Sequence, residues 1–155
     1  MVVNILELKN RWLFVLWAFM PVVLGLSIYV LWRPETIRLF GWLELVGLGS
    51  CVGLIRSYSI YVYDYIPEWI IFSLPNGLWA FSYAFIITAL WWGSNSKLKY
   101  LWLGSIPVLG LGYEIMQYPG VIRGVFCLQD LVICFIGIVL GTTISAMAGM
   151  RSVKP

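Results

Sequence analysis

Four polar residues in the last third of the sequence have types and spacing that could support chemistry. Glu114 and Gln117 are three residues apart, Arg123 follows, and Asp130 precedes a long apolar run. Residues three apart share one face of a helix, so Glu114 and Gln117 would point the same way. Arginine is a planar bidentate donor suited to phosphate, and a carboxylate can take up a proton or bind an amine. The four residues therefore suggest a polar pocket.

The same residues also allow a structural explanation. Arg123 could pair with Glu114 or Asp130 and lock the connection to its neighbouring helices. Asp130 could cap the helix that follows it, because a negative charge is favoured at a helix N-terminus. We keep both explanations open at this point.

Two residues elsewhere in the chain extend the candidate site. Asn76 follows Pro75 at the start of an apolar segment, and proline fits the first turn of a helix. Glu44 is the one carboxylate well inside an apolar stretch, where a charge is costly, although it could also be an interfacial residue on a tilted helix. The candidate ligand-binding residues are then Glu114, Gln117, Arg123, Asp130, Asn76 and Glu44.

Composition indicates that these side chains belong to a membrane protein. The 155 residues are 61% hydrophobic and 11% charged, and the mean hydropathy is +0.91. Soluble domains have roughly 45–50% apolar and about 25% charged residues. The absence of histidine excludes imidazole metal sites and Ser-His-Asp triads. No metal or organic cofactor is indicated, and the basic residues flank apolar runs instead of forming a nucleic-acid-binding patch.

Four apolar segments approach the length of about 20 residues that a bilayer core requires. They are 12–32, 75–92, 100–118 and 131–150. The first is longer than the roughly 7–15-residue apolar core of a signal peptide, so we interpret it as a retained transmembrane helix. A fifth segment, 39–55, is short and contains Glu44 and four glycines, so it is either a partial, re-entrant helix or a fifth span.

The distribution of basic residues favours four spans. With a cytoplasmic N-terminus and four spans, six of the ten Lys and Arg residues lie on the cytoplasmic side. If the segment 39–55 also crossed the membrane, every basic residue after it would change sides, and only four of the ten would be cytoplasmic, against the positive-inside rule. We therefore expect residues 1–155 to form one all-α domain with four transmembrane helices and one partial helix in the outer leaflet. Its location would be the inner (cytoplasmic) cell membrane, with both termini cytoplasmic.

Small residues recur every fourth position in the last apolar segment. Such a stripe allows close helix packing in lipid, where no hydrophobic force drives helices together. Its partner is either another helix of this chain or a second copy, so a homo-oligomer is one option. The stripe consists of Gly137, Gly141, Ser145 and Gly149.

The order and spacing of these residues resemble the VanZ-like family of small bacterial integral membrane proteins. The matching positions are Glu114, Gln117, Arg123, Asp130, Gly137 and Gly141. Cys134 stands where the family has asparagine, which weakens any role that needs a side-chain amide there. The family is named after a teicoplanin-resistance protein, and the resemblance implies a cell-membrane protein linked in some members to glycopeptide resistance. It does not imply a reaction.

Three functions follow as hypotheses. The first is non-enzymatic recognition of a lipid headgroup or a lipid-linked cell-envelope precursor, with Arg123 on the phosphate and the carboxylates orienting it. The second is an enzyme acting on a lipid phosphate, or a proton-coupled flippase, with Glu114 or Asp130 carrying the proton. The third is a structural or assembly subunit of a membrane complex. The expected partners are membrane lipids, and no nucleic acid.

Overall fold

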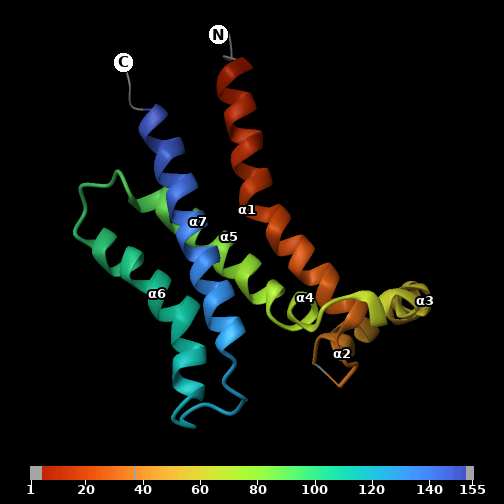
Figure 1. Ribbon diagram of the computed structural model, residues 1–155. Helices are drawn as coiled ribbons and strands as arrows, with labels where there is room; N and C mark the ends of the chain where they lie inside the picture. The colour runs from red at the N-terminus through yellow and green to blue at the C-terminus, as the bar shows by residue number, and fades with distance from the viewer. Residues whose placement is uncertain (1–4, 37, 153–155) are drawn as a thin grey trace.

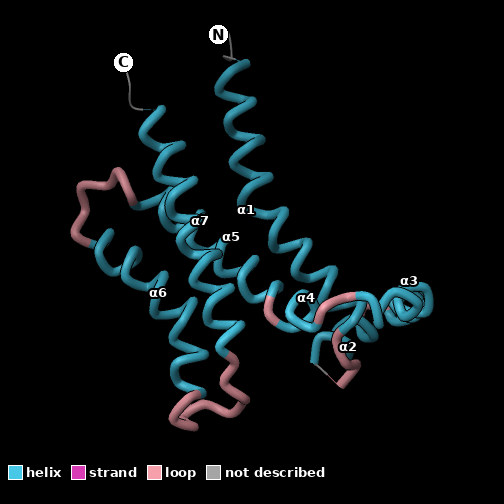
Figure 2. The backbone as a smooth tube through the Cα atoms, viewed as in Figure 1, coloured by secondary structure: helices cyan, strands magenta, loops and turns pink. Residues whose placement is uncertain are grey.

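The computed structural model describes residues 5–36 and 38–152, with side chains for 12–36 and 38–148. Every regular element within these residues is helical, which confirms the predicted all-α class (Figure 2). The elements are α1 (Ile5–Trp32), α2 (Arg38–Leu45), α3 (Gly49–Ser59), the 3-10 helix η1 (Ile60–Tyr65), α4 (Glu68–Phe72), α5 (Leu74–Trp91), α6 (Leu98–Gln117) and α7 (Leu128–Ser152). Among the charges that support the predicted topology, Lys154 and the side chains of Lys9, Arg11 and Arg151 lie outside the described residues.

The long helices α1, α5, α6 and α7 alternate in direction. Both chain ends lie at one end of the molecule, and the short helices α2, α3 and α4 lie at the opposite end of α1 (Figure 1). Helix α5 is central, because it packs against α1, α6 and α7. Phe81 and Phe85 of α5 form a buried cluster with Ala18 of α1. The core therefore follows α5, and the outer faces of the other helices remain uncovered.

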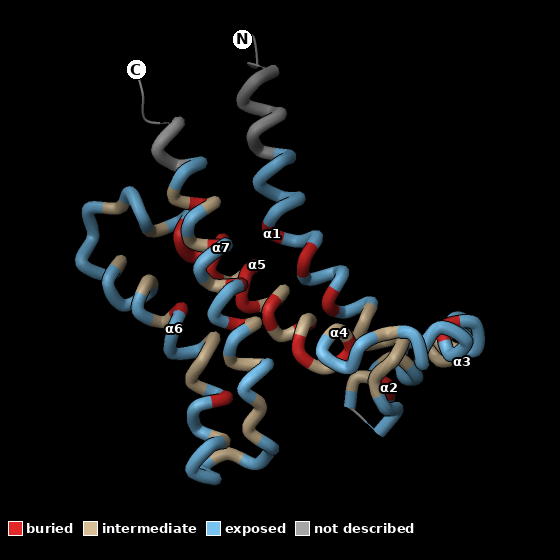
Figure 3. The backbone as a smooth tube through the Cα atoms, viewed as in Figure 1, coloured by how far each residue is buried: buried red, intermediate tan, exposed pale blue. Residues whose placement is uncertain are grey.

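Two helices are long and apolar enough to cross a membrane. The segments Trp12–Trp32 and Leu128–Ala148 each have 21 residues and a mean hydropathy of 2.3. Few of their residues are buried (Figure 3), and Phe19 and Val23 of α1 are each 58% exposed. A core helix of a soluble protein would bury such side chains. Helices α5 and α6 occupy the other two predicted spans, 75–92 and 100–118; a total of four crossing helices stays a prediction.

Two short helices occupy the segment 39–55, where the sequence predicts one partial or re-entrant helix. Helix α2 ends at Leu45 and α3 begins at Gly49, with Gly47 between them at a φ of +77°. Glycine adopts this left-handed conformation without steric cost, and Gly47 N donates to Glu44 O at 2.9 Å to close the turn. With 8 and 11 residues, neither helix reaches the length of about 20 that a span requires. The continuous helix that a fifth span would need is therefore absent from the described residues.

The glycine stripe of α7 packs against α5 of the same chain. A Cβ atom on Gly137 would overlap the carbonyl oxygen of Gly77, and one on Gly141 would overlap that of Phe81. The two backbones approach so closely only because these positions lack side chains. Gly137 and Gly141 thus pack α7 against α5. The sequence left open whether the partner of this stripe is a helix of the same chain or a second copy, and here it is a helix of the same chain. The fourth stripe position, Gly149, lies outside the described side chains.

Candidate functional site

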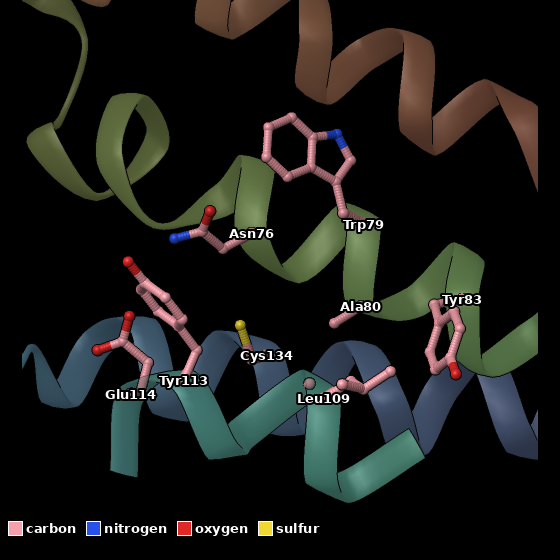
Figure 4. A pocket seen from close by; sticks show the side chains of 9 residues that line it. Asn76, Trp79, Ala80, Tyr83, Leu109, Tyr113, Glu114 and Cys134 are labelled. Atoms are coloured by element: carbon pink, nitrogen blue, oxygen red, sulfur yellow. The ribbon is translucent and has the colours of Figure 1, made fainter. Parts of the chain in front are cut away.

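A pocket of about 320 Å³ lies between α5, α6 and α7. Tyr113 and Glu114 of α6 and Cys134 of α7 point into the space beneath α5, where Asn76 lies (Figure 4). Aromatic and apolar side chains make up most of the remaining wall. The lining residues are Asn76, Trp79, Ala80, Tyr83, Leu109, Gly110, Tyr113, Glu114 and Cys134.

Glu114 is the buried acidic group of this pocket. Its side chain lies in the last turn of α6 and is 7% exposed. Its Oε2 accepts a hydrogen bond from the backbone N–H of Cys127 at 3.4 Å. With the Gln117 amide oriented so that its donors face acceptors, Nε2 donates to Glu114 Oε2 at 3.3 Å and to Val125 O at 3.2 Å. Glu114 and Gln117 thus lie on one face of α6, as their spacing predicts, and Gln117 joins the carboxylate to the following loop.

The loop 118–127 closes over the end of α6. Val121 N donates to Met116 O at 3.1 Å, and Gly120 has a φ of +76°. Gly124 has a φ of +151°, and a Cβ atom there would overlap the Gln117 amide. Glycine is needed at Gly124 both for its backbone conformation and for the close approach of the Gln117 side chain.

Asp130 lies in the first turn of α7, where the helix dipole favours its negative charge. Its Oδ2 accepts a hydrogen bond from Asn76 Nδ2 of α5 at 3.4 Å. Its Oδ1 is buried and has no hydrogen-bond partner within the described residues. A buried carboxylate oxygen without a partner is costly, so this group is poorly satisfied by the protein alone.

The structure leaves two candidate residues apart from this cluster. Arg123 is exposed in the loop 118–127, and the ion pair with Glu114 or Asp130 that one of the two explanations required does not form. The one ion pair within the described part of the chain joins Arg56 and Glu35. Glu44 is exposed in α2, which packs against α3, and it does not line the pocket. The structure thus brings together four of the six predicted residues: Glu114, Gln117, Asp130 and Asn76.

Comparisons with protein-family models, curated proteins and solved structures find no match for this chain. What the site can do is therefore argued from its geometry. The described residues contain no group of three or more Cys, Asp or Glu side chains placed to hold a metal ion. One carboxylate, Glu114, and one side-chain amide, Asn76, instead line an aromatic and apolar cavity, and each is hydrogen-bonded to a further polar residue behind it, Gln117 and Asp130 respectively.

The aromatic wall of the pocket was not predicted from the sequence. Tyr113 directly precedes Glu114, and Tyr83 reaches across from α5, where its hydroxyl lies 2.7 Å from Ser105 Oγ of α6. Trp79 lies beside α1, with its ring 5.5 Å from that of Tyr29. Three aromatic residues in one pocket give flat apolar surfaces beside the acidic groups. The four-residue spacing from Trp79 to Tyr83 places these two residues on one helix face, which is a signal that the sequence does contain.

Cys134 occupies a central place in the pocket. It is 5% exposed, and its Sγ points into the cavity between α5 and α6 (Figure 4). This is the position at which the VanZ-like pattern has asparagine. A thiol is a weak hydrogen-bond donor, whereas an amide has two donors and an acceptor. At this position the cavity wall therefore offers only a weak hydrogen-bond donor.

Proposed function

We propose that the chain is a VanZ-like multi-pass protein of the inner cell membrane, and that its pocket recognises the polar headgroup of a membrane lipid or of a lipid-linked cell-envelope precursor. In this proposal α1, α5, α6 and α7 cross the membrane, both termini are cytoplasmic, and the ends of α6 and α7 beside the loop 118–127 face outward. The pocket then opens at the depth of the outer lipid headgroups. The positive-inside distribution of basic residues supports this orientation.

The observation that carries the proposal is the pair of carboxylates without a cation. Glu114 is buried, Asp130 has one oxygen without a partner, and no described arginine or lysine pairs with either. Inside a membrane protein such groups are expensive and typically functional. A ligand that donates hydrogen bonds, through an ammonium group or several hydroxyls, would pair with Glu114, the carboxylate that lines the pocket, beside the Asn76 amide that holds Asp130. The aromatic wall would contact the less polar part of that ligand.

Arg123 completes the proposal from the loop 118–127. Its exposed guanidinium is not engaged in an ion pair within the described residues. Arginine binds phosphate through two parallel hydrogen bonds. A headgroup whose donor end enters the pocket would leave its phosphate outside, where Arg123 can contact it.

Lipid co-purification tests the proposal directly. The full chain and Glu114→Gln are purified from the same membranes, and the bound lipids are identified by native mass spectrometry. Asp64→Asn is the matched control, because Asp64 is an exposed carboxylate in η1 away from the pocket. We expect one lipid species to accompany the unaltered chain and Asp64→Asn but not Glu114→Gln. The same lipids in all three preparations would refute headgroup recognition by this pocket.

The two carboxylates also favour a second function, proton-coupled movement of a lipid or turnover of its phosphate. Glu114 and Asp130 belong to adjoining helix ends, and intramembrane carboxylates are common in proton relays. Labelled lipid in proteoliposomes would then move or react at a rate that depends on pH. Glu114→Gln would abolish that dependence, and an unchanged rate would exclude this function.

The proposal of a structural or assembly subunit makes a different prediction. Loss of function in Arg123→Ala would then accompany loss of stability or of partner binding, so a stable variant without function argues against it. A homo-oligomer also remains a proposal. Because α5 covers Gly137 and Gly141, a second copy would use another face of the chain.

A further inference from the structure

A second pocket, of about 450 Å³, lies where α1 ends. Its wall comes from the end of α1, from α3 and η1, and from Phe72 at the end of α4. Two arginines line it, Arg33 and Arg56, together with the carboxylate of Glu35. The pocket is thus basic, in contrast to the acidic pocket between α5, α6 and α7.

Arg33 carries a charge that no described carboxylate neutralises. Its guanidinium carbon lies 4.8 Å from the ring centres of both Tyr29 and Phe72. Its Nη2 donates to Phe72 O at 3.0 Å, while its Nε is buried and has no hydrogen-bond partner within the described residues. The two aromatic faces offset part of the cost of this charge. An anion would offset the remainder.

Arg56 is held in place on the other side of the pocket. Its Nη1 donates to Val30 O at 2.6 Å, and its guanidinium lies over the ring of Phe40 at 4.9 Å. Its Nε lies 3.2 Å from Glu35 Oε1, but the Glu35 side chain is 71% exposed. Because the Glu35 side chain is largely in solvent, this ion pair does not bury the carboxylate, and another anion can take its place beside Arg56.

Hydrogen bonds connect the segments that contain Arg33 and Arg56. Trp32 Nε1 donates to Ser59 O at 3.1 Å, and Ser59 Oγ donates to Leu31 O at 3.2 Å. These bonds tie the end of α3 to the end of α1, and Arg33 ties α4 to the same place. Both guanidinium groups are therefore positioned before any ligand arrives, which lowers the entropic cost of binding.

We propose that the Arg33–Arg56 pocket binds the phosphate group of an anionic membrane lipid. The apolar segment Trp12–Trp32 ends next to Arg33, so in a membrane the pocket lies at the level of the headgroups. Guanidinium groups match phosphate oxygens through paired, charge-assisted hydrogen bonds. The adjacent Ile60 and Tyr61 are 67% and 79% exposed and offer an apolar surface to the glycerol and acyl region. This site goes beyond the function proposed for the acidic pocket and does not depend on it.

The test compares phosphatidylglycerol, phosphatidylcholine and inorganic phosphate as probes of the full chain in detergent. Native mass spectrometry measures bound lipid, and thermal unfolding measures stabilisation by each probe. Arg33→Gln and Arg56→Gln each remove one charge from the pocket, and Arg38→Gln removes the same charge from the exposed start of α2. We expect phosphatidylglycerol to bind the unaltered chain and Arg38→Gln, and to bind the two pocket variants about tenfold more weakly.

The outcomes that overturn the proposal are distinct. Equal phosphatidylglycerol binding by the pocket variants and Arg38→Gln would refute the site. Equal binding of phosphatidylcholine would refute selection for an anionic headgroup, and stabilisation by inorganic phosphate alone would show that the ligand is a soluble phosphate. If the Gln variants do not fold, Arg33→Lys and Arg56→Lys are tested instead, because lysine keeps the positive charge but lacks the paired N–H donors of the guanidinium group. Unchanged phosphatidylglycerol binding in both lysine variants would overturn the proposal. Glu114→Gln should bind phosphatidylglycerol normally, which separates this site from the acidic pocket.

Discussion

Asn76 Nδ2 of α5 lies 3.4 Å from Asp130 Oδ2 of α7, although 54 residues separate them in the sequence. This hydrogen bond is the one polar side-chain link between the two helices that pack most closely within the described residues. It leaves the second oxygen of Asp130 buried without a partner. The helix pair that supports the pocket therefore contains an acidic group that the fold only half satisfies.

Removing the donor should destabilise the protein. Asn76→Leu leaves a buried carboxylate without its hydrogen bond, which we expect to lower the free energy of unfolding by about 1–3 kcal/mol. The double variant Asn76→Leu/Asp130→Leu removes both polar groups and should recover most of that loss. Thermal or denaturant unfolding in detergent measures both. A double variant less stable than Asn76→Leu would show that the carboxylate has a stabilising partner other than Asn76.

The contact between α5 and α7 should be intolerant of a single methyl group. Gly137→Ala places a Cβ atom against the Gly77 carbonyl, and overpacking of this kind costs about 1–3 kcal/mol. Gly104→Ala is the control, because a Cβ atom at Gly104 of α6 has no neighbour within 4 Å. That substitution should be neutral or stabilising by about 0.5–1 kcal/mol through helix propensity. Equal unfolding temperatures for the two variants would contradict the close packing of α5 and α7.

The loop 118–127 should hold the Gln117 side chain in position. Substitutions at two glycines of this loop distinguish loss of that position from the effect of backbone strain alone. Gly120→Ala and Gly124→Ala both place a side chain at positive φ, but only Gly124→Ala displaces the Gln117 amide. We expect both to lose stability and only Gly124→Ala to lose the lipid that co-purifies with the unaltered chain. Retention of that lipid by Gly124→Ala would show that Gln117 does not position Glu114 for binding.

The four-span topology predicts which loops face outward. Single cysteines at Tyr61, Asn95 and Val121 are introduced into a chain in which the native cysteines have been replaced by alanine. A membrane-impermeant maleimide added to intact cells should label Tyr61→Cys and Val121→Cys, and should label Asn95→Cys only after permeabilisation. Val121 and Tyr61 are 70% and 79% exposed, so both sites are accessible. Labelling of Asn95→Cys in intact cells would reverse the proposed orientation.

Much of the architecture can be predicted from the sequence, because it depends on local patterns. Long apolar runs place α5, α6 and α7 within three residues of their observed bounds and give the end of α1 at Trp32, although α1 begins at Ile5, before its apolar run. The three-residue spacing of Glu114 and Gln117 also predicts their shared face, since a helix repeats every 3.6 residues. The break at Gly47 was less clear, because four glycines in one short segment do not show which of them adopts a positive φ.

The sequence by itself determined the class of protein and the residues with costly charges, through composition and local spacing. Only the tertiary structure decided which of those residues meet. Asn76 joins Asp130 because α5 and α7 approach at their glycines, whereas Glu44 lies on a short helix that packs elsewhere. In the sequence, Arg33 and Arg56 serve only to indicate which side of the membrane a loop occupies. In the structure they share a pocket, because α3 folds back onto the end of α1. Such contacts depend on how helices pack across long sequence separations, and local periodicity carries no information about that.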